Sequence, residues 1–205
     1  MTTAVEAQSR SESLAADLAS VIEAVQRSVV MVRGSRETSG SGVVWTEAGA
    51  IVTNYHVAPG PFAQVILADG SRIPARVTRR STALDLALLE PEVAVPLPWN
   101  PAAVRDSADL RTGELVLAIG NPLGERNVAT MGVVVTAPGA ENPVRTAIVL
   151  RPGNSGGALA DSSGRVVGIP NVVMPGGLAL AVPTRAVQRF IAARHAAAAR
   201  VRVVA

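Results

Sequence analysis

Cysteine is absent from this chain of 205 residues, which excludes disulfide bonds and thiolate metal sites. Lysine is absent as well, so all 19 basic residues are arginine, set against 16 acidic residues. The arginines are scattered along the chain and form no basic cluster, so we expect no nucleic-acid partner. A chain of this length can bury a substantial core without covalent cross-links.

Long hydrophobic runs are also missing. No stretch approaches the roughly 20 apolar residues that a membrane-spanning helix needs. The first 20 residues carry polar and acidic groups and lack the basic start and apolar run of a secretory leader. We therefore expect no membrane span, and a cytoplasmic location for the chain as written. A periplasmic or exported location is expected if a leader was removed.

Short runs of Val, Ile, Leu and Thr, separated by Gly, Pro, Asn and Asp, fill residues 28–182. Runs of this length favour an all-β sandwich or barrel over alternating strands and helices. Residues 91–111 lack periodicity and divide the strands into two groups of about six, so we interpret them as a linker between two barrels. The expected strands are 29–33, 42–46, 50–53, 63–67, 73–78, 86–89, 115–119, 128–136, 144–150, 158–160, 166–169 and 178–182.

Helical spacing of apolar residues occurs only near the two ends. Leu14, Leu18, Val21 and Val25 predict a helix over 11–27 that follows a weakly ordered start at 1–10. An alanine-rich stretch predicts a second helix after Pro183. The expected organisation is a tail and helix at 1–27, a first barrel at 28–100, a second barrel at 101–183, and a helix and tail at 184–205.

A serine flanked by glycines occurs at residues 151–157 (RPGNSGG). Glycines at 153 and 157 tolerate unusual dihedral angles and a close approach of substrate. The segment therefore predicts an exposed Ser155 hydroxyl, with an oxyanion hole formed at Gly153, Asn154 and Ser155 by the N–H groups of Gly153 and Ser155. A serine hydroxyl is a weak nucleophile, so it needs a base within hydrogen-bonding reach.

The chain has only two histidines from which to take that base. His195 lies in the Ala- and Arg-rich tail, where a solvated surface histidine is expected, whereas His56 follows a predicted strand. Asp85 lies inside an apolar run, where a carboxylate is costly unless it has a partner, and orienting the His56 imidazole would supply one. Asp69 lies in a hairpin-turn sequence that needs no catalytic explanation. We predict the triad His56, Asp85 and Ser155.

Six segments in this order resemble the protease domain of the HtrA (Deg) family, a branch of the chymotrypsin-like serine proteases. They are residues 40–43 (GSGV), 53–57 (TNYHV), 85–89 (DLALL), 113–122 (GELVLAIGNP), 152–157 (PGNSGG) and 181–183 (AVP). The resemblance implies two antiparallel six-stranded β-barrels with the triad in the cleft between them. It implies an endopeptidase that cleaves unfolded or flexible proteins and peptides through an acyl-enzyme, without a metal or cofactor. Family members often form homotrimers through their N-terminal segments, and the helix expected after Ser11 could serve this purpose here.

The chain departs from the family pattern in three places. Family members usually carry a PDZ domain after the protease, and the residues after 183 are too few for one, so we expect regulation without it. Arg151 replaces the usual Asn, and Ala158 replaces the usual Pro. Both changes lie near the expected cleft and affect specificity and loop geometry rather than the triad.

Two further residues refine the expected mechanism. Trypsin-like zymogens use an Asp before the nucleophile to capture a new N-terminus, and this chain has Asn154, so we expect no dependence on N-terminal cleavage. Trypsin carries an Asp six residues before its serine, where this chain has Val149. We therefore expect an apolar S1 pocket and cleavage after aliphatic residues. The residues expected to line the pocket are Val149, Leu150, Arg151, Leu178, Ala179, Leu180 and Ala181.

Two other readings of the sequence stay open. Residues 153–157 also fit the Gly-x-Ser-x-Gly motif of α/β-hydrolases, but that fold needs an acid and then a histidine after the serine, and only His195 follows Ser155. The second alternative is a catalytically silent or latent two-barrel module that binds peptides. A fold by itself does not establish activity, so replacement of Ser155 is the test that separates the two functions.

Overall fold

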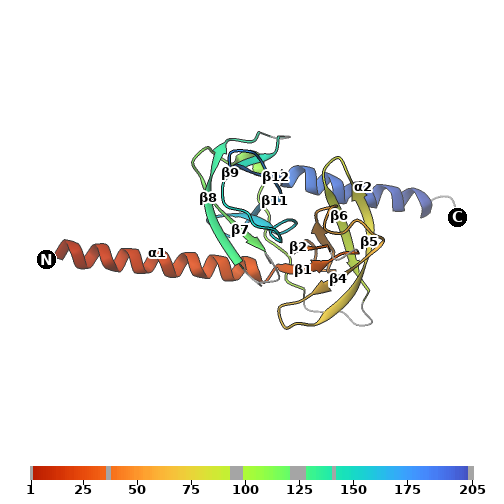
Figure 1. The fold of residues 1–205 in the computed structure, drawn as a ribbon, viewed down its shortest axis with the longest axis horizontal. Coiled ribbons are helices and arrows are strands. Elements are labelled where there is room, and N and C mark those ends of the chain that lie inside the picture. The colour runs from red at the N-terminus through yellow and green to blue at the C-terminus, as the bar shows by residue number, and fades with distance from the viewer. Residues whose placement is uncertain (1, 36–37, 93–98, 121–127, 140–141, 203–205) are drawn as a thin grey trace.

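A computed structural model describes residues 2–35, 38–92, 99–120, 128–139 and 142–202 of the chain. Strands form two bodies between a long N-terminal helix, α1 (Thr2–Gln26), and a C-terminal helix, α2 (Thr184–Arg202). Figure 1 shows α1 extending away from the barrels while α2 lies against them on the other side of the molecule. The side chains of residues 12–193 are described within these ranges, and those beyond are not.

The first six strands close into an antiparallel barrel in the order β1-β2-β3-β6-β5-β4, in which β4 pairs back onto β1. This confirms the predicted first group of six. Pairing Val32 with Gly40 and with Val65 places β1 between β2 and β4. The bounds are β1 (Val29–Arg33), β2 (Ser39–Val44), β3 (Ile51–Thr53), β4 (Phe62–Ile66), β5 (Arg72–Ser81) and β6 (Leu86–Pro91).

The second six strands close into another barrel, whose order β7-β8-β9-β12-β11-β10 repeats the topology of the first. The predicted all-β, two-barrel class is thereby confirmed. A short 3₁₀ turn, η1 (Ser107–Asp109), precedes this barrel. The bounds are β7 (Leu115–Gly120), β8 (Val128–Thr136), β9 (Val144–Ala147), β10 (Ala158–Asp161), β11 (Val166–Val173) and β12 (Ala179–Pro183).

The hydrophobic core consists of three clusters. One lies inside each barrel, and the third lies between the barrels and joins them. Successive residues of a strand point to opposite faces, so Leu88 faces the shared cluster while its neighbour Leu89 faces the interior of the first barrel. In the second barrel, Leu117 and Val116 divide in the same way. Both faces of these strands are buried, which explains why the sequence shows continuous apolar runs rather than alternation.

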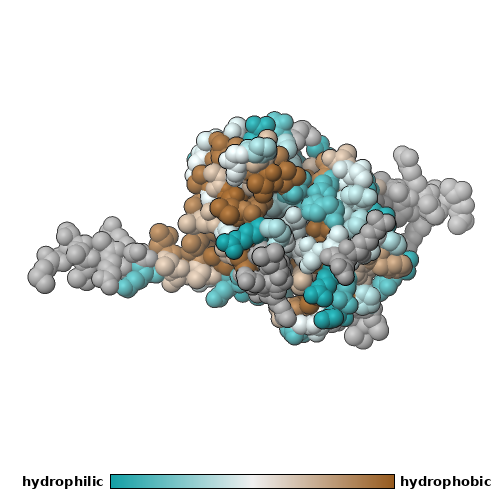
Figure 2. Space-filling view, viewed as in Figure 1, coloured by the Kyte–Doolittle hydropathy of each residue, from teal (hydrophilic) through white to brown (hydrophobic). Residues whose placement is uncertain are grey.

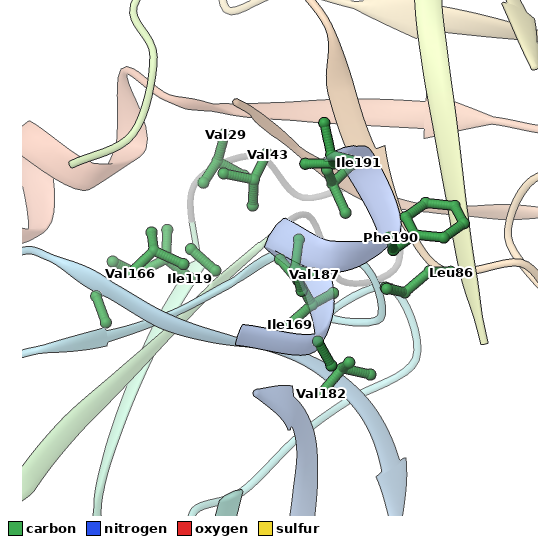
Figure 3. Packing of buried hydrophobic residues seen from close by; sticks show 14 of the residues in the cluster. Val29, Val43, Leu86, Ile119, Val166, Ile169, Val182, Val187, Phe190 and Ile191 are labelled. Carbon is green, nitrogen blue, oxygen red and sulfur yellow. The ribbon is translucent and has the colours of Figure 1, made fainter. Parts of the chain in front are cut away.

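Helix α2 supplies part of the cluster between the barrels. Figure 3 shows Val187, Phe190 and Ile191 of α2 among strand residues of both barrels, including Leu86 and Ile169. The last turns of α1 add Val25 to the same cluster, with Leu18, Val21 and Ile22 packed against it. The two helices therefore fix how the barrels sit on each other, and this placement determines the geometry of the cleft.

The linker also ties the barrels together through its backbone. The Ala102 N–H donates to the Val44 carbonyl of β2 at 2.9 Å, and the Arg105 N–H donates to the Val166 carbonyl of β11 at 3.0 Å. Residues 93–98 of the predicted linker lie outside the described residues.

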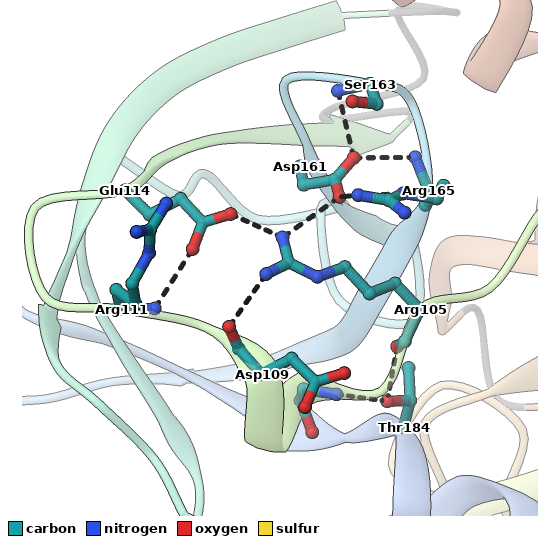
Figure 4. A network of polar contacts seen from close by, with 9 residues as sticks. Arg105, Asp109, Arg111, Glu114, Asp161, Ser163, Arg165 and Thr184 are labelled. Atoms are coloured by element: carbon teal, nitrogen blue, oxygen red, sulfur yellow. Dashed lines mark hydrogen bonds and ion pairs between the residues drawn. The ribbon is translucent and has the colours of Figure 1, made fainter.

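A network of polar contacts centred on the buried Asp161, at the end of β10, stabilises the second barrel (Figure 4). Asp161, with a side chain only 1% exposed, accepts hydrogen bonds from the N–H groups of Ser163 and Arg165 and from both the Arg105 and Arg165 guanidinium groups. Burial alone would raise the pKa of Asp161, but these donors outweigh it and the pKa is lowered. The Arg105 guanidinium likewise lowers the pKa of Glu114, its second partner.

Several boundaries differ from the sequence prediction. Helix α1 begins at Thr2 rather than after a weakly ordered start, because residues 2–10 contain good helix formers and no Gly or Pro. Strand β11 continues past Ile169 to Val173, since a register shift between Pro170 and Val172 accommodates the proline that would otherwise interrupt the ladder. Strand β9 ends at Ala147, three residues before the predicted end.

The surface of the second barrel carries exposed apolar side chains (Figure 2). They include Met131, Val133 and Val135 on β8, and Val172 and Val173 on β11. Among the described helices, none combines the length and the hydropathy required to cross a membrane.

Candidate functional site

His56 and Asp85 are joined by two hydrogen bonds at one end of the first barrel. His56 lies in the β3–β4 connection and Asp85 in the β5–β6 hairpin. The His56 Nδ1 atom lies 2.7 Å from Asp85 Oδ2, and the His56 backbone N–H donates to Asp85 Oδ1 at 3.0 Å. The Asp85 side chain is 23% exposed and the His56 side chain 49% exposed. The carboxylate thus fixes the orientation of the imidazole ring through Nδ1. Nε2 is the ring nitrogen that this contact does not use.

Asp85 makes this contact from a strained backbone. Its φ of 51° is the only positive value among the described residues other than glycine. The strain is offset because the Asp85 carbonyl accepts two further hydrogen bonds, from the Tyr55 N–H at 3.1 Å and from Asn54 Nδ2 at 2.9 Å. Left-handed residues of this kind persist where surrounding contacts over-determine them, and they concentrate at functional sites.

Ser155 lies in the β9–β10 connection, directly after a tight turn. The turn runs from Arg151 to Asn154 and is closed by the Asn154 N–H, which donates to the Arg151 carbonyl at 2.9 Å. Gly153 has a φ of 102°, the left-handed value that the third residue of a type II turn requires. The Asn154 side chain closes the turn a second time, because its Oδ1 accepts from the Arg151 N–H at 3.1 Å.

The Ser155 loop is docked on the first barrel. Ser41, on β2, donates its hydroxyl to the Gly153 carbonyl at 2.7 Å and its N–H to the Ser155 carbonyl at 2.9 Å. A Cβ on Gly156 would lie 2.3 Å from the Thr53 hydroxyl and 3.0 Å from the Asn54 nitrogen. The residue after Ser155 therefore lies directly against the segment that leads into His56.

The Ser155 hydroxyl and the His56 ring are not hydrogen-bonded to each other in the described structure. The N–H groups of Gly153 and Ser155 likewise have no hydrogen-bond acceptor among the described residues, although neighbouring backbone groups of the loop are paired. Two unpaired amides on a docked loop can bind an anionic oxygen.

A pocket of about 220 Å³ borders Ser155, with Asn171, Val172 and Val173 of β11 on one side. Leu150, Arg151 and Pro152 form the rest of its lining. A second pocket of about 130 Å³ lies next to it, lined in part by Leu84, Leu180 and Ala181. Asn171 borders both pockets, and its buried Oδ1 has no hydrogen-bond partner among the described residues.

The residues predicted to line the S1 pocket therefore occupy different places. Leu150 and Arg151 border the pocket at Ser155, whereas Val149 is 67% exposed and does not line it. The predicted segment 178–181 falls mostly on β12, which pairs with the pocket-lining part of β11: Val172 pairs with Leu180 and Val173 with Ala179. Leu180 and Ala181 of that segment line the second pocket, which shares Asn171 with the pocket at Ser155.

The other residues considered from the sequence, His195 and Asp69, lie in other parts of the fold. His195 lies in α2, far along the chain from Ser155, in the part whose side chains are not described. Within the described ranges, no group of three or more His, Cys, Asp or Glu side chains could hold a metal ion. Asp69 accepts a hydrogen bond from the Ser71 N–H in its turn, as a hairpin Asp does.

Comparisons with known proteins bear on this site. The family model for the trypsin-like peptidase domain matches residues 40–169. Serine protease HTRA4 of Homo sapiens is 35% identical over 199 residues, which cover 87% of this chain and 41% of that protein. Serine protease HTRA1 of Xenopus tropicalis is 34% identical over 168 residues, or 77% of this chain and 36% of that protein.

A plant relative belongs to the same group. Protease Do-like 1, chloroplastic, of Arabidopsis thaliana is 39% identical over 149 residues, which cover 66% of this chain and 33% of that protein. The chain thus spans less than half the length of the curated relatives it matches. The matched segment 40–169 contains His56, Asp85 and Ser155. The chain belongs to the trypsin-like peptidase family, in its HtrA/Deg-like branch.

Proposed function

We propose that this chain is a serine endopeptidase in which Ser155 is the nucleophile, His56 the general base and Asp85 the residue that orients the base. The observation that carries the proposal is the bidentate contact of Asp85 with the His56 ring and backbone, next to the docked Ser155 loop. An endopeptidase of this class needs a nucleophile, a base and an orienting carboxylate drawn together from separate loops.

In the proposed reaction, neutral His56 takes the Ser155 proton as the hydroxyl oxygen attacks the substrate carbonyl. Asp85 stays ionised and stabilises the imidazolium that forms. The leaving amine then takes a proton from His56, and water hydrolyses the acyl-enzyme by the same steps. The Ser155 hydroxyl has to approach the ring from its resting position, and hydrogen bonds of this type often tighten only when substrate binds.

The N–H groups of Gly153 and Ser155 are proposed to hold the oxyanion. Their lack of acceptors supports this role, because an amide already paired within the protein would not be available to the tetrahedral intermediate. The positive φ of Gly153 supports it too. The central peptide points in opposite directions in type I and type II turns. Here that peptide carries the Gly153 N–H, so the positive φ of Gly153 goes with one direction of this N–H.

The substrates are proposed to be unfolded or flexible polypeptides cleaved after aliphatic residues. The pocket beside Ser155 has Leu150, Val172 and Val173 in its wall, and this lining favours an apolar side chain of moderate size. Digestion of a peptide library with mapped cleavage sites tests this preference, and a clear choice of Arg or Lys at P1 would refute it.

Labelling with a fluorophosphonate probe, with the modified residue mapped by mass spectrometry, tests the nucleophile without a guess about substrate. We expect labelling at Ser155 in the native protein, its loss in Ser155→Ala and His56→Ala, and its retention in His195→Ala as the matched control. A folded protein that neither labels nor cleaves unfolded casein would instead indicate a silent or latent peptide-binding module.

Assembly is a separate part of the proposal. We infer a homo-oligomer formed through α1, with the trimer of the HtrA family as its expected form, since this helix extends from the body and leaves Leu14 69% exposed while its last turns pack on the barrels. Light scattering on the whole chain and on Leu14→Glu tests the inference, and an unchanged mass in the variant would count against the helix as the contact.

A further inference from the structure

The Ser41 hydroxyl makes a hydrogen bond between the two barrels at the candidate site. Ser41 lies on β2 of the first barrel and is fully buried, with 0% of its surface exposed. Its hydroxyl donates to the Gly153 carbonyl of the second barrel at 2.7 Å, and its N–H donates to the Ser155 carbonyl at 2.9 Å. One residue of the first barrel therefore holds the carbonyls on either side of Asn154.

The peptide between Gly153 and Asn154 connects this contact to the oxyanion loop. Its carbonyl is held by the Ser41 hydroxyl, and its N–H makes the 2.9 Å hydrogen bond to Arg151 that closes the turn. Carbonyl and N–H point to opposite sides of one rigid peptide plane. Whatever fixes the direction of the carbonyl therefore also fixes the closing hydrogen bond, and with it the turn in which Gly153 has its φ of 102°.

A second hydrogen bond connects Ser41 to the base. The Ser41 carbonyl accepts from the Thr53 hydroxyl at 2.6 Å, and Thr53 ends β3 three residues before His56. A continuous chain thus runs from the His56 segment through Thr53 and Ser41 to the Gly153 carbonyl. The space around it is tight, because a Cβ on Gly156 would lie 2.3 Å from both the Ser41 carbonyl and the Thr53 hydroxyl.

We propose that Ser41 is a positioning residue for the reaction, whose hydroxyl holds the oxyanion loop in register with the His56 side of the cleft. The proposal rests on the function proposed above and adds a residue that touches neither substrate nor the reacting atoms. Its loss leaves the Gly153 carbonyl without its donor, and the peptide then turns to find another. Because the oxyanion contacts strengthen in the transition state, the effect falls on kcat rather than on KM.

The test compares three variants of the whole chain on a fluorogenic peptide, with rates normalised to folded protein. Ser41→Ala removes the donor, and Ser41→Cys keeps a weak one. Thr146→Val is the matched control, because Thr146 is also buried and also donates its hydroxyl to a carbonyl, that of Ala179 on β12 rather than one of the Ser155 loop. We expect kcat to fall about tenfold in Ser41→Ala and less in Ser41→Cys, with KM within about twofold in both. Thr146→Val should keep kcat within about twofold.

Two further readouts separate positioning from general destabilisation. The inhibition constant of a peptide aldehyde, whose adduct places an oxyanion in the hole, should weaken by the same factor as kcat in Ser41→Ala. Hydrogen exchange of the Asn154 amide should become about tenfold faster, because the peptide that carries it, once released by Ser41, no longer holds its hydrogen bond to the Arg151 carbonyl. Unchanged kcat and unchanged exchange in folded Ser41→Ala would overturn the proposal, as would an equal loss of kcat in Thr146→Val.

The exchange measurement also keeps the two proposals apart. A wild-type protein without peptidase activity or Ser155 labelling would refute the proposed function, whereas Asn154 exchange would still report whether Ser41 holds the turn. An active wild-type enzyme with a fully active Ser41→Ala variant would refute only the role of Ser41.

Discussion

The two barrels share one topology but support their halves of the site differently. His56 lies in the β3–β4 connection and Ser155 in the equivalent β9–β10 connection. The His56 turn is held by its own barrel, since Asp85 supplies four acceptor contacts to residues 54–56. The Ser155 loop is held by its own barrel through the Gly156 N–H, which donates to the Pro170 carbonyl at 3.1 Å, and also by the first barrel, where Ser41 holds two of its carbonyls. The first half of the site is held within one barrel, and the second depends also on how the barrels meet.

The equivalent hairpins sharpen this contrast. Asp85 lies in the β5–β6 hairpin of the first barrel and has a positive φ of 51°, although it is not a glycine. The β11–β12 hairpin has Gly176 and Gly177 at that level, with positive φ values and open space where a Cβ would lie. The first barrel thus uses this hairpin for the site, whereas the second leaves it open at the surface.

The largest effect on kcat is expected when the contact between Asp85 and His56 in the first barrel is broken. Asp85→Asn keeps the size of the side chain but removes the charge that stabilises an imidazolium and fixes its tautomer. We expect kcat to fall by about 10⁴-fold, with the fold retained, when peptide hydrolysis and thermal unfolding are measured together. Asp69→Asn is the control, since Asp69 lies in a turn of the same barrel, and its kcat should not change. A loss below tenfold would remove Asp85 from the proposed triad.

The next effect comes from disturbing the half that depends on the interface. In Gly156→Ala, the new Cβ meets the Ser41 carbonyl and the Thr53 hydroxyl at 2.3 Å, at a residue with a φ of +79°. The loop has to move, and a displacement of about 1 Å costs roughly 100-fold in rate. We therefore expect kcat to fall by about 100-fold or more.

Gly176→Ala is the matched control for that variant, because Gly176 also has a positive φ, of +91°, but its Cβ would meet nothing within 4 Å. It should lose about 1 kcal/mol of stability from backbone strain and keep its activity. Equal activity in the two variants would show that the contact between Gly156 and the first barrel is unimportant for catalysis.

The sequence predicted more of the fold than of the site. Runs of β-forming residues between turn residues located twelve strands, and their division into two groups of six is confirmed. Site residues marked by local chemistry, such as Ser155 between glycines and Asp85 in an apolar run, were also identified, although their catalytic roles stay predictions. The position of Asn171 at both pockets and the role proposed for Ser41 were not predicted. Both depend on which strands meet in space, and neither residue type is unusual in its local sequence.

Acid should lower the free energy of unfolding of the wild-type protein more than that of an Asp161→Asn variant. The pKa values of Asp161 and Glu114 are lowered by their hydrogen-bond donors, from ordinary values of 3.8 and 4.5. As the pH falls through about 4, the unfolded chain takes up protons before the folded one, so the free energy of unfolding decreases and keeps decreasing down to the lowered pKa values. The stabilisation is complete above that range.

Urea unfolding at pH 7 and at pH 3.5 checks this prediction. At pH 7, Asp161→Asn should lose about 1–3 kcal/mol, because it weakens charge-assisted hydrogen bonds to Arg105 and Arg165. Its stability should then change less with acid than that of the wild-type protein. A parallel decline in both proteins would mean that other carboxylates control the acid limb.

The smallest effect is expected at Arg151, where backbone and side chain have separate tasks. The Arg151 backbone closes the turn before Ser155 at both its N–H and its carbonyl, while its exposed side chain borders the pocket. Arg151→Asn preserves the backbone contacts, so kcat/KM for a substrate with an aliphatic P1 residue should stay within about threefold. An exposed charge contributes about 0.2–1 kcal/mol to a contact, so substrates with an acidic residue beside P1 should lose at most about fivefold relative to their neutral counterparts. Cleavage of paired peptides that differ only in that residue measures the ratio. A loss of activity on every substrate would instead mean that the Arg151 side chain supports the loop, and the second half of the site would then be less dependent on the first barrel than its hydrogen bonds indicate.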